Sequence, residues 1–295
     1  MRVLVTGARG KVGSHAVAAL QRAGHDVTAT DLHPPAFERD LPGEPAYVRA
    51  DLTDAGAAIA VVDGHDAVVH TAAIPDPLHD PPLHVFRSNV MSSMHVIDAC
   101  VRLGVERLVN VSSETVPGFV FGAGRVQPPY LPIDEEAPAA AQDEYGFGKE
   151  VVERWCDRVA LRDGLSIITV RPSWVATADN VERNLGPVVR DPFQPSGNFW
   201  SWTDAEDLGE ALRLACEVDH AGHTVLYVAQ PDNGTGVPLR DLVERVNPEL
   251  LDRVRDDLPR PDASGIDASR AQQLLGWSPT RELTDWLDED GRLLG

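Results

Sequence analysis

The amino-acid sequence predicts an α/β protein whose core is a doubly wound parallel sheet. Short apolar segments alternate with longer amphipathic segments as far as Arg171-Pro172, and such alternation is typical of βαβ units. A glycine-rich segment directly follows the first apolar run. Beyond residue 172 the alternation weakens and prolines become frequent, which predicts a second, smaller part of the chain.

Each element follows from its own pattern. Strands are expected over short apolar, β-branched runs, at residues 3–5, 27–30, 46–50, 67–70, 107–111 and 165–170. Helices are expected over the longer amphipathic stretches 11–23, 84–103 and 143–162. Right-handed crossovers between parallel strands should place helices on both faces of the sheet.

The second part has a weaker pattern. Residues 173–200 contain several prolines and glycines and are expected to form a loop with little regular structure. A helix is expected over 204–218 and a strand over 225–228. The predicted division is therefore a first domain over 1–171 and a C-terminal lobe over 172–295, with elements of about 203–228 returning to the main sheet.

Composition limits the partners and the compartment. The 295 residues carry 26 Lys and Arg against 46 Asp and Glu, a formal net charge of -20. A field of that sign repels nucleic acids and anionic membrane surfaces, and no apolar run approaches the roughly 20 residues of a membrane span. The cysteines Cys100, Cys156 and Cys216 have no paired spacing. We therefore expect a cytoplasmic protein with free thiols, without a signal peptide before the first strand.

The glycine-rich segment predicts a dinucleotide site. Gly7, Gly10 and Gly13 follow the first strand and open the first helix. Such glycines let the backbone approach a pyrophosphate, which the helix N-terminus attracts with free N–H groups and a positive dipole end. The first domain is therefore expected to be an NAD-binding Rossmann domain. The expected contacts in this loop are Gly7, Arg9, Gly10, Lys11, Val12 and Gly13.

Acidic residues after the next strands indicate which dinucleotide is bound. Asp31 follows the second strand, where a carboxylate accepts hydrogen bonds from the adenosine ribose and repels a 2′-phosphate. NAD is therefore the expected cofactor, although Arg9 and His33 are cations that a 2′-phosphate of NADP could use. Asp51, with Leu52, follows the third strand. It fits either a place beside the adenine or a simple cap formed with Thr53.

Three further residues predict proton and hydride chemistry. Tyr145 and Lys149 are four residues apart on an expected helix and share a face. A free tyrosine has a pKa of roughly 10, which a nearby ammonium and an oxidised nicotinamide ring should lower. The phenolate could then take a hydroxyl proton while hydride leaves for the nicotinamide. Ser113 follows the fifth strand, at the sheet edge where ligands bind.

In this order, these motifs resemble the extended short-chain dehydrogenase/reductase group, the NAD-dependent epimerase/dehydratase family. The resemblance covers most of the chain and rests on the glycine loop, Asp51-Leu52, His70-Thr71-Ala72-Ala73, Asn89, Val111-Ser112-Ser113-Glu114-Thr115-Val116, Pro132-Ile133-Asp134-Glu135, Tyr145-Gly146-Phe147-Gly148-Lys149, Arg171-Pro172, the stretch 204–208 and Leu275-Gly276-Trp277-Ser278-Pro279. It implies that Thr71, Ala72, Ala73 and Asn89 contribute to the cofactor site. It also implies that Ser113 rather than Ser112 carries the catalytic hydroxyl.

The chain departs from the family pattern near the expected substrate. Dehydratases carry an Asp-Glu pair after the catalytic hydroxyl, where this chain has Glu114 and Thr115, and this counts against 4,6-dehydration. The usual V-Y-G after the serines is Val116-Pro117-Gly118. Nucleotide-sugar epimerases usually carry a diphosphate-binding Arg where this chain has Trp200. Trp200 and Trp202 could stack on a sugar face or pack inside the lobe, and packing is favoured.

The resemblance implies a sugar-like substrate with a secondary alcohol. The missing Arg and the short lobe favour a free sugar or sugar acid, as in uronate dehydrogenases, over a nucleotide sugar. The expected substrate contacts are Ser112, Ser113, Glu114, Ser173, Arg183 and Trp200. Net oxidation and redox-neutral epimerisation would use the same Ser, Tyr and Lys. A non-catalytic NAD(H)-sensing protein is an alternative, which the retained Tyr145 and Lys149 disfavour.

Two further expectations concern metals and assembly. His65, His70, His79, His84 and His95 lack the spacing of a ligand set, and the family chemistry needs no metal, so no metal site is expected. The family pairs its two long helices into a four-helix bundle between subunits. A homodimer through residues 84–103 and 143–162 is therefore expected. The apolar residues taken to support it are Val90, Met94, Ile97 and Val101.

Overall fold

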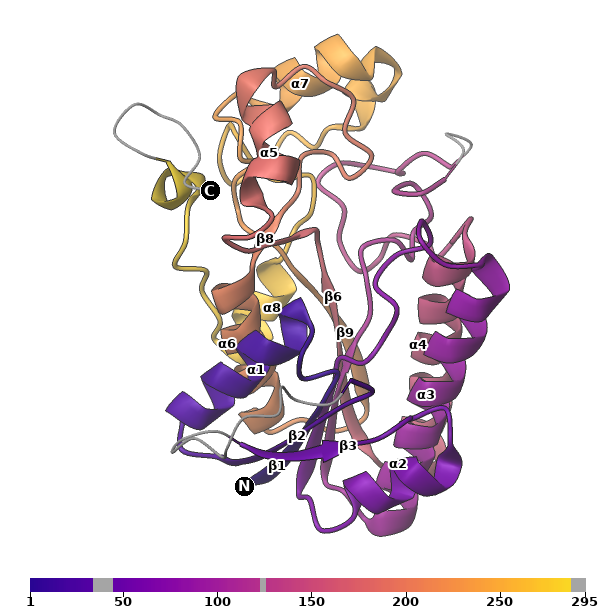
Figure 1. The fold of residues 1–295 in the computed structure, drawn as a ribbon. Helices are drawn as coiled ribbons and strands as arrows, with labels where there is room; N and C mark the ends of the chain where they lie inside the picture. Colours follow the sequence, from indigo (N-terminus) through magenta and orange to yellow (C-terminus); the bar gives the residue numbers. More distant parts are fainter. Residues whose placement is uncertain (34–44, 123–125, 288–295) are drawn as a thin grey trace.

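A parallel sheet runs through the centre of the molecule (Figure 1). The computed structural model describes residues 1–33, 45–122 and 126–287. The strands are β1 (Arg2–Thr6), β2 (Asp26–Asp31), β3 (Ala46–Arg49), β4 (Ala67–His70), β5 (Arg107–Val111), β6 (Ser166–Pro172) and β9 (His223–Val228). Their spatial order is β3-β2-β1-β4-β5-β6-β9, and every pair is parallel. The expected doubly wound α/β fold is confirmed.

Helices cover both faces of this sheet (Figure 1). One face carries α1 (Lys11–Arg22), α6 (Ala205–Glu217) and α8 (Ser269–Leu275), and the other carries α2 (Ala55–Val62), α3 (Pro82–Leu103) and α4 (Glu144–Asp163). Successive side chains of a strand point to opposite faces. Val3 and Val5 therefore pack with α1 and α6, whereas Leu4 packs with α3 and α4. Because both faces of the sheet are buried, the sequences of its strands are continuous apolar runs.

The order of the strands fixes where a ligand can enter. The chain runs outward from β1 to β3 and then crosses back to β4. In doubly wound sheets a crevice opens at this reversal, beyond the carboxyl ends of the strands. The elements after β8 (Thr203–Asp204) rejoin the sheet, since α6 packs on it and β9 pairs with β6.

A small lobe lies beyond that edge of the sheet, at the top of Figure 1. It contains α5 (Val181–Arg190), α7 (Leu239–Val246), the 3-10 helices η1 (Pro248–Arg253) and η2 (Leu283–Trp286), and the two-stranded pairing of β7 (Val175–Ala176) with β8. The segment after β5 also joins the lobe, because Ile133 bridges to Ile266 and Leu131 to Val254.

Two segments differ from the sequence-based expectation. Residues 173–200 were expected to be a loop, but they include α5, with Pro187 inside it. The helix forms because Val181 and Leu185 bury against Trp202, and such packing outweighs a weak local propensity. Helix α2 was not expected either; Asp54 caps it by accepting a hydrogen bond from Ala57 N at 2.8 Å. None of the helices in the described ranges is long and apolar enough to cross a membrane.

Candidate active site

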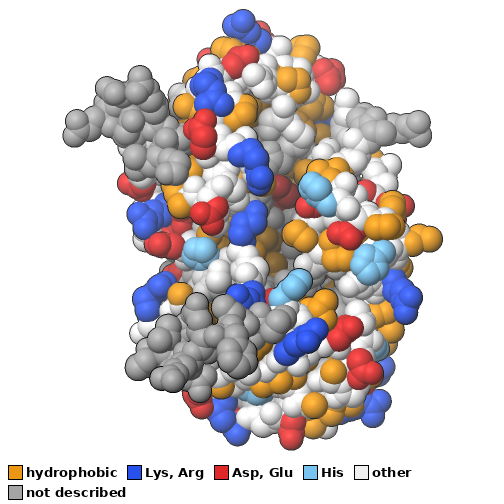
Figure 2. Space-filling model, in the orientation of Figure 1, with side chains coloured by type: hydrophobic (Ala, Val, Ile, Leu, Met, Phe, Trp, Pro, Cys, Tyr) orange, Lys and Arg blue, Asp and Glu red, His pale blue; other side chains and the backbone are white. Residues whose placement is uncertain are grey.

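A cavity of about 1410 Å³ lies between the carboxyl edge of the sheet and the lobe. Figure 2 shows this face hollowed between the two parts of the molecule, with Lys and Arg side chains along the hollow. The cavity is larger than the roughly 300–1,000 Å³ of an ordinary small-molecule pocket, so it has room for two ligands. The lining includes the glycine loop at one end and Ser113, Tyr145 and Trp200 at the other.

The glycine loop has the shape that a diphosphate requires. Gly7 has φ +64°, and a Cβ there would lie 2.6 Å from Ala72 Cα. A Cβ on Gly13 would lie 2.2 Å from the Gly7 carbonyl oxygen, so this glycine permits close packing of α1 on the loop. Gly10 precedes α1 without a capping side chain. The first N–H groups of α1 are therefore free for an anion, and the loop fits a dinucleotide.

Asp31 lies at the end of β2 and lines the same cavity. Its carboxylate accepts hydrogen bonds from Arg9 N at 3.1 Å and His33 N at 3.2 Å. The acid is thus held in place by backbone N–H groups. This geometry suits a carboxylate that accepts hydrogen bonds from ribose hydroxyls.

Asp51 bonds to Thr53 but does not cap α2, and its place beside the adenine stays a prediction. Its carboxylate accepts hydrogen bonds from Thr53 N at 2.9 Å and Thr53 Oγ1 at 2.7 Å, and these bonds lower its pKa. The cap of α2 is Asp54, so Asp51 forms a turn before the helix. Asp51 and Leu52 nevertheless line the cavity.

The segment after β4 forms the other wall of the cofactor end. Thr71 donates to Thr6 O at 2.7 Å, and Thr71, Ala72 and Ala73 line the cavity. Asn89 was expected to contact the cofactor. Instead, its amide accepts from Ile74 N at 2.8 Å and donates to Ile74 O at 3.0 Å. Asn89 therefore fixes the position of the segment that follows β4.

Ser113, Tyr145 and Lys149 meet in the cavity, as the sequence predicted. Ser113 and Tyr145 are hydrogen-bonded. Lys149 Nζ lies 5.8 Å from the centre of the Tyr145 ring and donates to Val111 O at 2.7 Å. Helix α4 presents the tyrosine and the lysine, and the end of β5 presents the serine. Ser113 and Tyr145 can therefore act on one oxygen atom, with the Lys149 ammonium near the tyrosine ring.

The pKa values at this point differ from the expectation. Burial raises the pKa of Tyr145 to about 12, and the hydrogen bond with Ser113 only partly offsets it. Burial also lowers the pKa of Lys149 to about 8. We expected the ammonium to make the phenol more acidic, but the charges that act on Tyr145 include the carboxylates of Asp143, Glu114 and Asp76. Without added positive charge, the phenol therefore keeps its proton.

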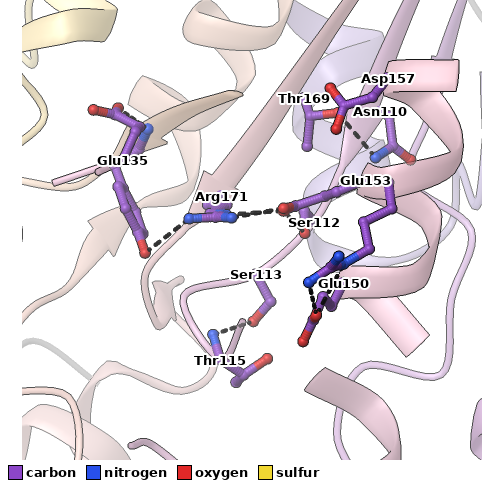
Figure 3. A network of polar contacts seen from close by, with 12 residues as sticks. Asn110, Ser112, Ser113, Thr115, Glu135, Glu150, Glu153, Asp157, Thr169 and Arg171 are labelled. Carbon is purple, nitrogen blue, oxygen red and sulfur yellow. Dashed lines mark hydrogen bonds and ion pairs between the residues drawn. The ribbon is translucent and has the colours of Figure 1, made fainter. Parts of the chain in front are cut away.

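Ser112 belongs to a different network (Figure 3). Its hydroxyl donates to Glu153 Oε1 at 2.5 Å, and Glu153 accepts two bonds from Arg171, at 2.8 and 2.6 Å. Arg171 also donates to Tyr227 Oη at 3.3 Å. The side chains of Glu153 and Arg171 are buried. The hydroxyl of Ser112 is thus engaged inside the protein, while the residue also lines the cavity, so its role as a substrate contact stays a prediction.

Glu114 is held at the substrate end of the cavity. Ser173 Oγ donates to its carboxyl at 2.5 Å and Asn198 Nδ2 donates at 3.3 Å. The backbone of Trp174 also forms a hydrogen bond with it. Burial raises the pKa of Glu114 to about 7 despite these donors. Asn198 was missed by the sequence analysis, since a lone Asn in a proline-rich segment gives no signal.

The two tryptophans differ in their exposure to the cavity. Trp202 is fully buried, and its indole N–H donates to Asp232, so it packs inside the lobe. Trp200 packs in the lobe core but also lines the cavity, and its indole N–H donates to Pro192 O at 3.1 Å. Phe199 and Trp200 have φ of 54° and 58°. Such strained conformations are held only by their surroundings.

The Lys and Arg side chains that line the cavity are not paired with acidic side chains in the part of the chain that the structure describes. Arg9, Lys11, Lys149 and Arg183 form no ion pair among the residues described. Arg183 lowers the pKa of Lys11, second to burial, which places its charge near the glycine loop. In a protein of net charge -20, these cations are available to an anionic ligand.

The histidines show other roles. His70 is buried between Thr6 Oγ1 at 2.8 Å and Ser93 Oγ at 2.9 Å, and burial lowers its pKa to about 3. His95 contacts Leu52 O at 3.1 Å. Within 1–33, 45–122 and 126–287, no group of three His, Cys, Asp or Glu side chains could hold a metal ion.

Comparison with known proteins gives the family of the chain. The profile of the NAD dependent epimerase/dehydratase family matches residues 3–227. A UDP-glucose 4-epimerase of Corynebacterium glutamicum is 27% identical over 313 residues, which cover 95% of this chain and 91% of that protein. An L-arabinose 1-dehydrogenase (NAD(P)(+)) of Haloferax volcanii is 33% identical over 190 residues, which cover 62% of this chain and 71% of that protein.

A solved structure shares the architecture. The UDP-glucose-4-epimerase of Stenotrophomonas maltophila, with bound NAD and formylated UDP-arabinopyranose, superimposes with a TM-score of 0.68 at 27% identity. The match covers 97% of this chain and 95% of that chain. The likeness therefore includes both the sheet and the lobe.

Proposed function

Because the chain belongs to the NAD dependent epimerase/dehydratase family, we propose that it is an NAD-dependent enzyme that moves a hydride at a secondary alcohol carbon of a sugar-like substrate. One observation carries this proposal. Ser113, Tyr145 and Lys149 meet at one point of a cavity whose other end is the glycine loop. A side-chain set for proton transfer next to a dinucleotide cradle is what alcohol oxidation requires.

Each of the three residues has a distinct part. Tyr145 holds or takes the proton of the substrate hydroxyl, and Ser113 hydrogen-bonds the same oxygen. Lys149 is fixed by Val111 O and keeps a positive charge beside the tyrosine ring. When bound, oxidised NAD supplies the hydride acceptor and the extra positive charge that favours the phenolate. Since the buried phenol has a pKa of about 12, it is otherwise poised to donate its proton, which suits carbonyl reduction.

We propose NAD rather than NADP because of Asp31. Its carboxylate is fixed by two backbone N–H groups and would repel a 2′-phosphate. Changing Asp31 to Ala should weaken NAD binding and narrow the preference over NADP, as measured by calorimetry with each dinucleotide. Tighter binding of NADP to the unmodified protein would contradict the assignment.

For the substrate, we propose a free sugar rather than a nucleotide sugar. Trp200 occupies the position where the epimerases carry a diphosphate-binding Arg, and its indole N–H is engaged by Pro192 O. Arg190 lies in the preceding segment and could replace that Arg, but it forms an ion pair with Glu182. The relative that acts on L-arabinose is compatible with a small substrate. UDP-sugar epimerisation remains the second candidate, supported by the relatives with that activity.

One experiment separates these candidates. Free sugars, sugar acids and UDP- or dTDP-sugars are offered with NAD, and absorbance at the NADH band is followed together with epimer formation. Dehydrogenation releases NADH, whereas an epimerase retains its cofactor. Calorimetry of the NAD-loaded protein with UDP should show weak binding. A dissociation constant of tens of micromolar or tighter would favour the nucleotide-sugar epimerase.

We also propose a homodimer through α3 and α4. Of the four side chains expected to support it, Val90 and Ile97 are buried in the core of the chain, and Met94 and Val101 are partly buried against that core. Other apolar side chains on the two helices are exposed, namely Leu83, Met91, Phe147 and Leu161. Phe147 also stacks on Phe86 of α3, with ring centres 5.6 Å apart. Light scattering at micromolar concentration should report twice the mass of one chain.

A further inference from the structure

Glu114 places a carboxyl group in the substrate end of the cavity without a cation to neutralise it. Its backbone N–H donates to Pro172 O at 3.1 Å, which ties the residue to the end of β6 beside Ser113. Only 5% of the residue is exposed, and it lines the cavity. Among the ion pairs of the described residues, none includes Glu114. Its partners, Ser173, Asn198 and the Trp174 backbone, are all neutral.

The hydrogen bonds leave room for one more donor. An ionised carboxylate has about four acceptor positions and no donor. Three are used by Ser173 Oγ, Asn198 Nδ2 and the Trp174 backbone. Asn198 is itself fixed, because it also donates to Ser201 O at 2.7 Å. The carboxylate is therefore held rigidly, with one position left for a ligand hydroxyl.

This arrangement also removes a side chain that was expected to bind a substrate carboxylate. Ser173 was expected to act with Arg183 on a sugar acid, but its hydroxyl is donated to Glu114. Arg183 instead acts electrostatically on Lys11 in the glycine loop. A second carboxylate near Glu114 would thus meet like charge, and neither Ser173 nor Arg183 is placed to offset it. Such contacts are strongly unfavourable where water is excluded.

We propose that Glu114 is a specificity-determining residue, which accepts a hydrogen bond from a hydroxyl group of a neutral sugar and excludes sugar acids. The proposal rests on the proposed function, since it concerns the substrate of the same site. A sugar hydroxyl donates to a carboxylate in a charge-assisted hydrogen bond. A sugar acid would place its own carboxylate against that of Glu114.

The selection should depend on pH. Burial raises the pKa of Glu114 to about 7, so the side chain gains its charge across the neutral range, while sugar acids stay ionised throughout. Among the residues described, the other titratable groups around this end are Asp76 after β4, Tyr227 on β9, and Asp143, Tyr145 and Lys149 at the start of α4. Lys149, with a pKa of about 8, also loses charge as the pH rises. A variant at Glu114 is therefore needed to separate the two titrations.

The test compares matched pairs, galactose with galacturonate and glucose with glucuronate. Binding is measured by calorimetry on NAD-loaded Tyr145→Phe protein, in which turnover is blocked. At pH 8 the neutral member should bind at least about tenfold more tightly, and the ratio should fall several-fold at pH 6. In the Tyr145→Phe protein that also carries Glu114→Gln, the ratio should approach one and lose the part of its pH dependence that Glu114 contributes.

A second variant covers the case in which Glu114→Gln does not fold. Ser173→Ala keeps the carboxyl but removes a donor that stabilises its charge, so the midpoint of the pH dependence should move upward. Equal or tighter binding of the acid at pH 8, or an unchanged ratio in Glu114→Gln, would overturn the role of Glu114. Failure of the proposed function looks different: sugars bind in the expected ratio, but the unmodified enzyme forms neither NADH nor an epimer.

Discussion

Two glutamates, buried to nearly the same degree, lie near the neighbouring serines Ser112 and Ser113. Glu153 is 6% exposed and Glu114 is 5% exposed. Glu153 accepts the hydroxyl of Ser112 and is paired with Arg171 (Figure 3). Glu114 follows Ser113, meets only neutral donors and lines the cavity.

The difference teaches how one strand end can serve both structure and chemistry. The ion pair with Arg171 compensates the buried charge of Glu153, so the network around Ser112 has no unpaired charge at Glu153. Glu114 is compensated only in part, by neutral donors, and its pKa rises to about 7. Nearby, the pKa of Tyr145 is raised to about 12 and that of Lys149 is lowered to about 8. Perturbed groups gathered in a cavity are typical of a functional site.

The largest effect is expected on the cavity side of this comparison, at Tyr145. Changing Tyr145 to Phe removes the oxygen that carries the proton but keeps the ring. Turnover should fall roughly 10²–10⁴-fold, measured as NADH formation with the best substrate of the panel. NAD affinity, measured by calorimetry, should change little. Activity near that of the unmodified protein would remove Tyr145 from the mechanism.

A change in the network of Ser112, Glu153 and Arg171 should instead affect the stability of the fold. Changing Glu153 to Gln leaves the charge of Arg171 buried without its partner. The free energy of unfolding should decrease by about 3–5 kcal/mol, as measured by denaturant titration. Any variant protein that stays folded should keep its NAD affinity. A loss below 1 kcal/mol would mean that Arg171 is compensated by other groups.

The two serines provide the sharpest version of the comparison, because they are adjacent and chemically identical. Ser113→Ala should lower kcat/KM by roughly 10²-fold through the loss of one hydrogen bond to the reacting oxygen. Ser112→Ala, the matched control, should keep kcat/KM within a few-fold and lower the unfolding free energy instead. If the two variants exchanged these effects, the catalytic hydroxyl would be that of Ser112.

The smallest effect concerns the dependence of stability on pH. The folded pKa of Glu114 is raised from 4.5 to about 7, so the folded protein binds the proton more tightly than the unfolded chain does. Protonated Glu114 therefore stabilises the folded state at low pH, and this contribution to the free energy of unfolding is lost as the pH rises from about 5 to 8. The Glu114→Gln variant does not show this loss. The difference between its free energy of unfolding and that of the unmodified protein should therefore increase by about 2 kcal/mol over that pH range. A constant difference would contradict the raised pKa.

The sequence by itself determined the sheet, the glycine loop and the grouping of the three residues proposed as catalytic. These features are encoded locally: strand and helix periodicities, glycines at fixed spacing, and Tyr145 and Lys149 one helical turn apart. Parallel strands then bring their carboxyl ends to one edge, which is why Ser113 could be expected near Tyr145. The strand bounds differ from the expected ones by only a few residues.

Tertiary structure alone decided the rest, because the deciding contacts join distant parts of the chain. Helix α5 exists because its apolar side chains pack on Trp202, although its own sequence contains Pro187. Ser112 and Ser113 look alike in the sequence and differ only because Glu153, 41 residues away, accepts one hydroxyl. Glu114 meets Ser173 and Asn198 across separations of 59 and 84 residues. Burial and long-range partners set the charge of a side chain, and neither can be read from its neighbours in sequence.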